Sequence, residues 1–593
     1  MAYVELRCSR VPEFGCIESI KGGEKMSYDL LIKGGRIYDG SGLPSFIGDI
    51  GVKAGRIAEI GRIHENAKQT IDAQGLAVSP GFIDHHTHMD AQVFWDPFAT
   101  SEPQHGVTSI VMGNCGLTLA PVKDASAAYD ALVKNFVRVE AIPRSVLEQG
   151  VPWGWHTFGD YLDALEGKVG INVGGLVGHI AVRQYAMAEE SVEREATAKE
   201  IEQMRGLVRA AMEGGALGFS TNRNERHMRE DGKPVASRLA SDEELFALCG
   251  VLGDLNAGVI ETIFGRNRIE HFQSYDRLAR ATGRPVLWQS LHHRWVEPNL
   301  WREQLNAVEP IFKDGFQAYG LSQTVPLVRH FSLRNAQVFD EFPTWKALMF
   351  LPEAARKDAF KDAETRKKLR ADLADPRPTN FHRRWDIVRV EKTVKAENDK
   401  YAGKTVEEMA RMRGQDPLDA LIDLSLEEDL GTVFWNANTG GDPVAMGEIL
   451  RSPYVLVGTS DAGAHVQFGA DFGYGTTLLG LWVRERKVLS LEHAIHKLTF
   501  HVASIFGLQG RGLLRTGQAA DIVVFDSENV KAHEPEWAAD YPGATKRLIQ
   551  RSDGIHHTIV NGRPIYQNGC LTGELPGEVL RGSAYRGRQA VAA

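Results

Sequence analysis

The chain has 593 residues, 43% of them hydrophobic and 24% charged, which is typical of a globular protein long enough for two or more domains. Its formal net charge of −9 shows no excess of basic residues, so a nucleic-acid partner is not expected. No stretch approaches about eighteen consecutive apolar residues, so a membrane-spanning helix is not expected either.

The first 26 residues lack the basic start, apolar core and cleavage site of a signal peptide, and they show no clear periodicity. We interpret residues 1–26 as an extension, either disordered or preceding an alternative start. The five cysteines have no regular spacing, so they do not form a disulfide framework. Together these features predict a cytoplasmic protein.

Short β-type runs separated by glycine turns occupy both ends of the chain. Residues 27–78 include YDLLIKGGRIYDGSG, and residues 512–575 include GQAADIVVFD and HHTIVNGRPIYQNG. We predict one small β-sandwich domain built from both termini, with two unrelated β segments as the alternative. Residues 576–593 then form a C-terminal tail.

Between these ends, residues 79–511 alternate short apolar runs with helical patterns, which is typical of βα units around a parallel sheet. Eight units predict a (β/α)8 TIM barrel, whereas a doubly wound sheet would not need eight. The seventh strand is either FQAYGLS or GTVFWNAN. The expected strands are LAVSPGFID, GVTSIVMGN, INVGGLVGH, ALGFST, GVIETI, PVLWQS, one of those two runs, and YVLVGTSD.

The pattern loosens at about 323–415, where a highly charged amphipathic helix is expected at 353–376. We interpret this stretch as an insertion at the barrel mouth. It is either a solvated excursion or a lid over the substrate.

Polar residues gather where the expected barrel strands end, which is where barrel enzymes carry their reactive groups. His86 and His88 are one residue apart, so on a strand both side chains point to the same face and can reach one cation. His85 points the other way, and we expect it to be structural.

Cys115 ends the second strand, and a thiolate there is a good zinc ligand, although a buried free cysteine is often only a small hydrophobe. Asp461 ends the last strand and can take a proton from water activated by a metal, although a helix-capping role is the alternative. His465 follows four residues later and can line the same mouth.

His292 and His293 follow the sixth strand, and only one of them can easily face the barrel axis. Arg294 comes next and can bind a carboxylate through two hydrogen bonds. His179 lies at the end of the third strand and is a further candidate for substrate binding. The chain has no phosphate-binding GxxxxGK[ST] loop and no GxSxG serine motif.

Several of these segments, GLAVSPGFIDHHTH, GVTSIVMGNCG, VGTSDAGAH and GLLRTGQAADIVVFD, resemble the metal-dependent amidohydrolase superfamily. GNCG in this place is similar to the D-aminoacylase (N-acyl-D-amino-acid deacylase) branch. The resemblance implies a set of metal ligands, with Asp461 also acting as general base and Arg294 standing where typical deacylases have a lysine. The implied ligands are His86, His88, Cys115, His292 and Asp461.

One position departs from the family pattern, because Ile263 stands where the fifth strand is expected to carry a histidine ligand. The resemblance therefore implies one firmly held Zn²⁺ and a second site that is weak or absent.

The expected activity is zinc-dependent hydrolysis of a small-molecule amide, with an N-acyl amino acid of D type favoured. Alternatives are hydrolysis of a cyclic amide, as in hydantoinases, a metal-dependent decarboxylation, and a non-catalytic scaffold protein. Association into a homo-oligomer is compatible with this type of barrel.

Overall fold

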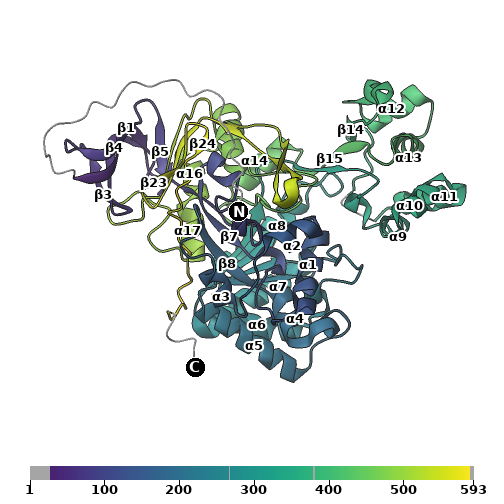
Figure 1. Cartoon of the computed structure of the whole chain (residues 1–593), viewed down its shortest axis with the longest axis horizontal. Coiled ribbons are helices and arrows are strands. Elements are labelled where there is room, and N and C mark those ends of the chain that lie inside the picture. Colours follow the sequence, from purple (N-terminus) through teal and green to yellow (C-terminus); the bar gives the residue numbers. More distant parts are fainter. Residues whose placement is uncertain (1–26, 266–267, 378, 380, 588–593) are drawn as a thin grey trace.

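A parallel barrel forms the centre of the computed structural model, which describes residues 27–265, 268–377, 379 and 381–587 (Figure 1). Its eight strands are hydrogen-bonded in the order β16-β12-β11-β10-β9-β8-β7-β6, so the predicted (β/α)8 barrel is confirmed. The seventh strand is FQAYGLS rather than GTVFWNAN. The barrel strands are β6 (Phe82–Asp84), β7 (Val107–Met112), β8 (Asn172–Gly178), β9 (Gly218–Asn222), β10 (Val259–Ile263), β11 (Val286–Gln289), β12 (Ala318–Ser322) and β16 (Val455–Val457).

The barrel closes where the first and last strands end. Thr87 and Ala462 form a parallel bridge, and the backbone N–H of His88 donates to the carbonyl of Ala462 at 2.7 Å. The backbone N–H of Asp461 in turn donates to the carbonyl of His86 at 3.1 Å. The seam of the barrel therefore brings two segments that carry candidate site residues side by side.

Helices cover the outside of the barrel, since strands such as VTSIVM and NVGGLVG are buried along their whole length and need cover on both faces. Successive helices α5 to α8 contact one another around the ring. The helices of this layer and its extensions are α1 (Ser126–Val139), α2 (Arg144–Gly150), α3 (Phe158–Asp163), α4 (His179–Met187), α5 (Ala198–Glu213), α6 (Asp242–Leu255), α7 (Ile269–Thr282), α8 (Leu300–Lys313), α14 (Pro443–Arg451), α15 (Tyr474–Thr477), α16 (Leu491–Leu498) and α17 (Phe500–Phe506).

Strands from both termini form one nine-stranded sheet, which confirms the predicted composite β domain. The two ends of the chain meet where β5 pairs antiparallel with β17. Leu30, Ile50 and Ile522 contribute to a common apolar core. The strands are β1 (Tyr28–Ile37), β2 (Phe46–Lys53), β3 (Arg56–Gly61), β4 (Ala67–Asp72), β5 (Ala77–Pro80), β17 (Ile522–Phe525), β22 (Ile555–Val560), β23 (Arg563–Gln567) and β24 (Cys570–Leu571).

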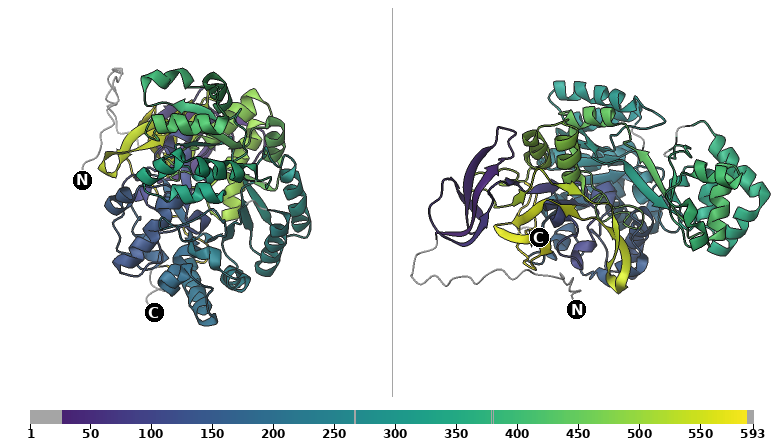
Figure 2. Two further views of the ribbon diagram at one scale, coloured as in Figure 1. Left: turned by 90° about the vertical axis from the view of Figure 1, so that its right-hand side faces the viewer. Right: turned by 90° about the horizontal axis from the view of Figure 1, so that it is seen from above.

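The insertion is a separate helical unit with its own apolar core, and it projects from the barrel (Figure 2). It extends past the predicted end at 415, because α13 packs on α12 and β15 pairs with β13 and β14. GTVFWNAN therefore belongs to this three-stranded sheet. The elements are β13 (Leu327–Phe331), α9 (Pro343–Met349), α10 (Glu353–Lys361), α11 (Ala363–Ala374), β14 (Arg389–Lys392), α12 (Val406–Arg413), α13 (Pro417–Glu427) and β15 (Val433–Thr439).

The described part of the predicted tail packs against the barrel. The backbone N–H groups of Gly577 and Leu580 donate to the carbonyls of Val169 and Val173 at 2.9 and 2.7 Å. Two short strand pairs, β18 (Lys531–Ala532) with β21 (Ser552–Asp553) and β19 (Glu536–Tyr541) with β20 (Thr545–Ile549), lie outside the nine-stranded sheet. The proposed extension at 1–26 lies outside the described residues. Within the described ranges, no helix is both long and apolar enough to cross a membrane.

Candidate metal centre

His86 and His88 follow β6 directly and are almost completely buried at the barrel mouth. Their Nε2 atoms lie 3.5 and 3.3 Å from Oδ1 of Asp461. His85, by contrast, stacks on Phe506 with ring centroids 6.1 Å apart, so it points away from this cluster as expected.

Cys115 lies in a tight turn, Asn114–Gly116, after β7 and has a left-handed backbone with φ of 55°. Its Sγ lies 3.6 Å from Nε2 of His86 and accepts a hydrogen bond from Nε2 of Gln289 at 2.8 Å. Its backbone N–H donates to the carboxylate of Glu261 at 2.9 Å. Burial, together with Glu261, raises the pKa of the Cys115 thiol well above its ordinary value. The thiol therefore needs a nearby cation to ionise.

Asp461 also has a left-handed backbone, with φ of 58°, in the turn after β16. Burial acts to raise the pKa of Asp461, but hydrogen bonding to His86 and His88 outweighs it and holds this pKa well below the usual range. Gly463 lets the turn approach β6, because a Cβ there would lie 2.7 Å from the carbonyl oxygen of His88. Strained backbone of this kind is a common feature of functional sites.

Glu140 and His465 complete the inner wall of the site. Oε1 of Glu140 lies 3.6 Å from Nδ1 of His88, and Oε2 lies 3.8 Å from Nε2 of His465. Burial acts to lower the pKa of His88, but Glu140 and Asp461 outweigh it and raise this pKa to about 9. Glu140 follows α1, at the end of a helix rather than a strand, so no strand-end pattern in the sequence points to it.

The donor set fits a zinc ion. The ligand atoms of His86, His88 and Cys115 all lie within 4.8 Å of one another, and Asp461 lies against both histidines. Two imidazoles, one thiol and one carboxylate are the ligand types that Zn²⁺ prefers. Glu140 beside His88 places a carboxylate behind a metal-binding histidine, which is a frequent arrangement in zinc sites.

His292 does not join this cluster, although the resemblance implies it as a ligand. It lies past β11, is buried and lines the same pocket, and neither of its ring nitrogens has a hydrogen-bond partner among the described residues. Ile263, at the end of β10, also lines the pocket. His293 packs on Trp295 instead, with ring centroids 5.3 Å apart, so the two adjacent histidines face different surroundings.

His179 is not among the residues that line the pocket, so its role in substrate binding stays a prediction. It begins α4 and is fully buried. Its Nδ1 lies 2.8 Å from Oγ1 of Thr221, and its Nε2 lies 2.8 Å from a carboxylate oxygen of Glu244. Both ring nitrogens are occupied, so His179 ties α4 to β9 and α6.

The pocket over the metal centre is shared between the barrel and the insertion. The barrel contributes His88, Cys115, Asp461 and Arg294, while the insertion contributes side chains such as Phe331. The loop after β9 adds Arg226 and His227, which lie four and five residues past the strand, so their position in the sequence does not mark them as strand-end residues.

Comparisons with known proteins agree with this architecture. A model described as "Amidohydrolase family" matches residues 69–566. A D-aminoacylase of Alcaligenes xylosoxydans xylosoxydans is 29% identical over 569 residues, which cover 95% of this chain and 99% of the relative. An N-acyl-D-aspartate deacylase of the same organism is 29% identical over 564 residues, covering 93% and 95%.

A solved structure of N-acyl-D-glutamate deacylase from Bordetella bronchiseptica, complexed with zinc and a phosphonate inhibitor, is also similar. It has 26% sequence identity and a TM-score of 0.64, and the match covers 93% of this chain and 99% of that one.

Proposed function

Because the chain belongs to the amidohydrolase family, we propose that it is a zinc-dependent hydrolase of N-acyl amino acids. The observation that carries the proposal is the convergence of His86, His88, Cys115 and Asp461 on one point of the barrel mouth. Zinc bound there supplies Lewis acidity, which makes a water more acidic and polarises the substrate carbonyl.

Asp461 acts as the general base and then as the general acid. Its low pKa keeps it ionised at neutral pH, so it can accept a proton from the attacking water. The same carboxyl then delivers that proton to the leaving amine. Glu140 and Asp461 both contact the imidazole of His88, which orients that ring toward the centre of the site.

An N-acylated amino acid of D configuration is the proposed substrate. The full-length relatives named above are a D-aminoacylase and an N-acyl-D-aspartate deacylase. Arg294, which is buried and lines the pocket, is suited to bind the α-carboxylate through its planar guanidinium. Cys115 supports the deacylase assignment over a hydantoinase-like activity. Hydantoinases usually keep a lysine that becomes carbamylated, whereas this chain has the cysteine in its place.

We propose one firmly held zinc ion per chain. Ile263 offers no ligand atom where the family resemblance calls for histidine, and His292 lies outside the group of converging ligand atoms. Metal analysis of protein purified without chelators is expected to give about one zinc per chain. Two tightly held ions would contradict this stoichiometry, and protein free of metal would favour a non-catalytic scaffold.

A hydrolysis screen tests the activity. The substrates are matched N-acetyl-D- and N-acetyl-L-amino acids and cyclic amides, each with zinc added and with zinc removed. We expect zinc-dependent release of the free D-amino acid. In Asp461→Asn, turnover is expected to fall by about a hundredfold or more, with zinc content largely retained. Preferential hydrolysis of cyclic amides would overturn the deacylase proposal.

A further inference from the structure

The loop between β9 and the turn at 236–239 carries four basic side chains, and three of them form ion pairs. Arg223 pairs with Asp242 at 2.7 Å, and Lys233 pairs with Glu193 at 3.0 Å. The buried Arg229 pairs with Asp231 at 2.5 Å. Arg226 lines the pocket and has no hydrogen bond or ion pair from its guanidinium to any described residue.

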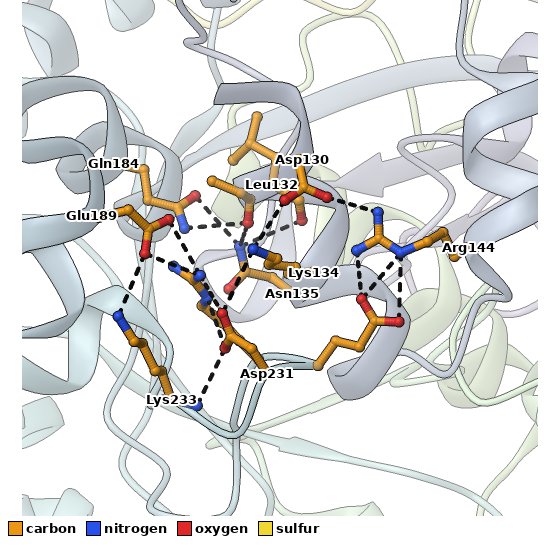
Figure 3. A network of polar contacts seen from close by, with 12 residues as sticks. Asp130, Leu132, Lys134, Asn135, Arg144, Gln184, Glu189, Asp231 and Lys233 are labelled. Carbon is orange, nitrogen blue, oxygen red and sulfur yellow. Dashed lines mark hydrogen bonds and ion pairs between the residues drawn. The ribbon is translucent and has the colours of Figure 1, made fainter. Parts of the chain in front are cut away.

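Ion pairs join the loop to residues of the barrel helices (Figure 3). Asp231 lies 3.7 Å from Nζ of Lys134 on α1, and Lys233 lies 3.7 Å from Glu189 behind α4. Met228 and Pro234 form an antiparallel bridge across the loop. These contacts hold the loop backbone next to Arg226 in place. The side chain of Arg226 therefore reaches the pocket without an ion pair to a described residue.

The charges around Arg226 do not neutralise it. Asp340 is the acidic residue that the insertion contributes to the pocket lining, and it already pairs with Arg138 at 2.6 Å. Asp461 and Glu140 lie against His86, His88 and His465 at the metal centre. Burial is the main cause that lowers the pKa of His227 and His292, and the positive charge of Arg226 acts in the same direction. Burial raises the pKa of Asp340, and Arg138 and Arg226 oppose this rise. Among the described residues of the pocket, no carboxylate therefore lies within ion-pair distance of the Arg226 guanidinium.

We propose that Arg226 binds a second carboxylate of the substrate, so that the preferred substrate is an N-acylated dicarboxylic amino acid. This inference rests on the proposed function, in which Arg294 takes the α-carboxylate. The two guanidinium groups come from different loops, Arg226 after β9 and Arg294 after β11, and both line the same pocket. A planar guanidinium binds a carboxylate through two parallel hydrogen bonds, so it discriminates strongly against a neutral group of the same shape.

N-acetyl-D-glutamate and N-acetyl-D-glutamine provide the test, because they are nearly equal in size and differ by one charge. We expect the wild-type kcat/KM for the glutamate derivative to exceed that for glutamine by about tenfold or more. Arg226→Gln is expected to bring this ratio close to one, mainly through a higher KM for glutamate. Arg226→Lys is expected to retain part of the preference, since lysine keeps the charge without the paired donors.

Lys199→Gln is the control, because it removes an exposed cation of α5 that lies outside the pocket and outside the ion pairs that hold the loop; its substrate ratio is expected to equal that of the wild type. Zinc content and the melting temperature of each variant show that it is folded and loaded. Equal wild-type rates on both derivatives, or an unchanged ratio in Arg226→Gln, would overturn the inference while leaving the deacylase proposal intact. If no N-acyl amino acid is hydrolysed, including neutral ones, the proposed function itself fails.

Discussion

Arg138, near the end of α1, forms a largely buried ion pair of 2.6 Å with Asp340 of the insertion. The same guanidinium donates to Oδ1 of Asn335 at 3.2 Å, and the side chain of Gln337 donates to the carbonyl of Arg138 at 2.7 Å. Arg138 lies two residues before Glu140, which contacts His88. These contacts join the insertion to the barrel beside the metal centre.

Replacing Asp340 with Ala should loosen this junction. Removing one partner leaves the other charge buried without compensation, which costs about 3 kcal/mol in a site of this kind. We expect KM to rise with a smaller change in kcat, because the insertion forms part of the pocket wall. Limited proteolysis should cleave the insertion faster. Asp358→Ala serves as the control, because it removes an exposed acid on α10 that pairs with Lys361. If both variants show the same KM and the same rate of cleavage, the Arg138–Asp340 pair does not hold the insertion to the barrel.

Gln289→Leu should weaken metal binding without removing a proposed ligand. The amide of Gln289 donates to Sγ of Cys115 at 2.8 Å, and such a donor stabilises the thiolate that binds a metal. Groups that orient metal ligands typically contribute about 10- to 100-fold in affinity. Competition with a chromophoric chelator measures the change. An unaltered zinc affinity would show that the hydrogen bond does not support the thiolate.

Two buried thiols allow a paired test of the ligand set. Cys115 lies in the cluster with His86 and His88, while Cys249 is buried on α6 away from it. Cys115→Ser is expected to lose most of its zinc, and its cobalt-substituted form should lack the sulfur-to-cobalt absorption band. Cys249→Ser should keep both. Retention of the band in Cys115→Ser would exclude this thiol as a ligand.

Much of the site could be predicted because of one geometric rule. In a parallel barrel all carboxyl ends of the strands face one mouth, so polar residues just past buried runs converge there. His86, Cys115 and Asp461 are far apart in sequence, yet the structure brings them together. The branch was also predictable, and its full-length relatives confirm it.

What could not be predicted depends on tertiary packing. Glu140 follows a helix, and only the closed fold brings it against His88. His179 has the right position along its strand, but Thr221 and Glu244 occupy both of its nitrogens. The end of the insertion was misplaced because β15 resembles a barrel strand in sequence, and only its pairing with β13 and β14 distinguishes it.

A buried lysine far from the metal centre gives a prediction for pH. Lys497 on α16 is 1% exposed, and its Nζ donates to the carbonyls of Ser452 and Val455 at 2.8 and 3.1 Å. Burial lowers the pKa of Lys497 from 10.5 to about 8. Between these two pH values the unfolded chain binds more protons than the folded one, so the free energy of unfolding should rise with pH.

This contribution amounts to about 3 kcal/mol over the whole interval. It disappears in Lys497→Met, which keeps the length of the side chain without the titrating group. Urea unfolding at pH 7.5, 9 and 10.5 should therefore show the wild type gaining stability relative to this variant as pH rises. Lys168→Met, at an exposed lysine, should follow the wild type at every pH. If the Lys497→Met curve runs parallel to the wild-type curve instead, Lys497 keeps its ordinary pKa in the folded protein.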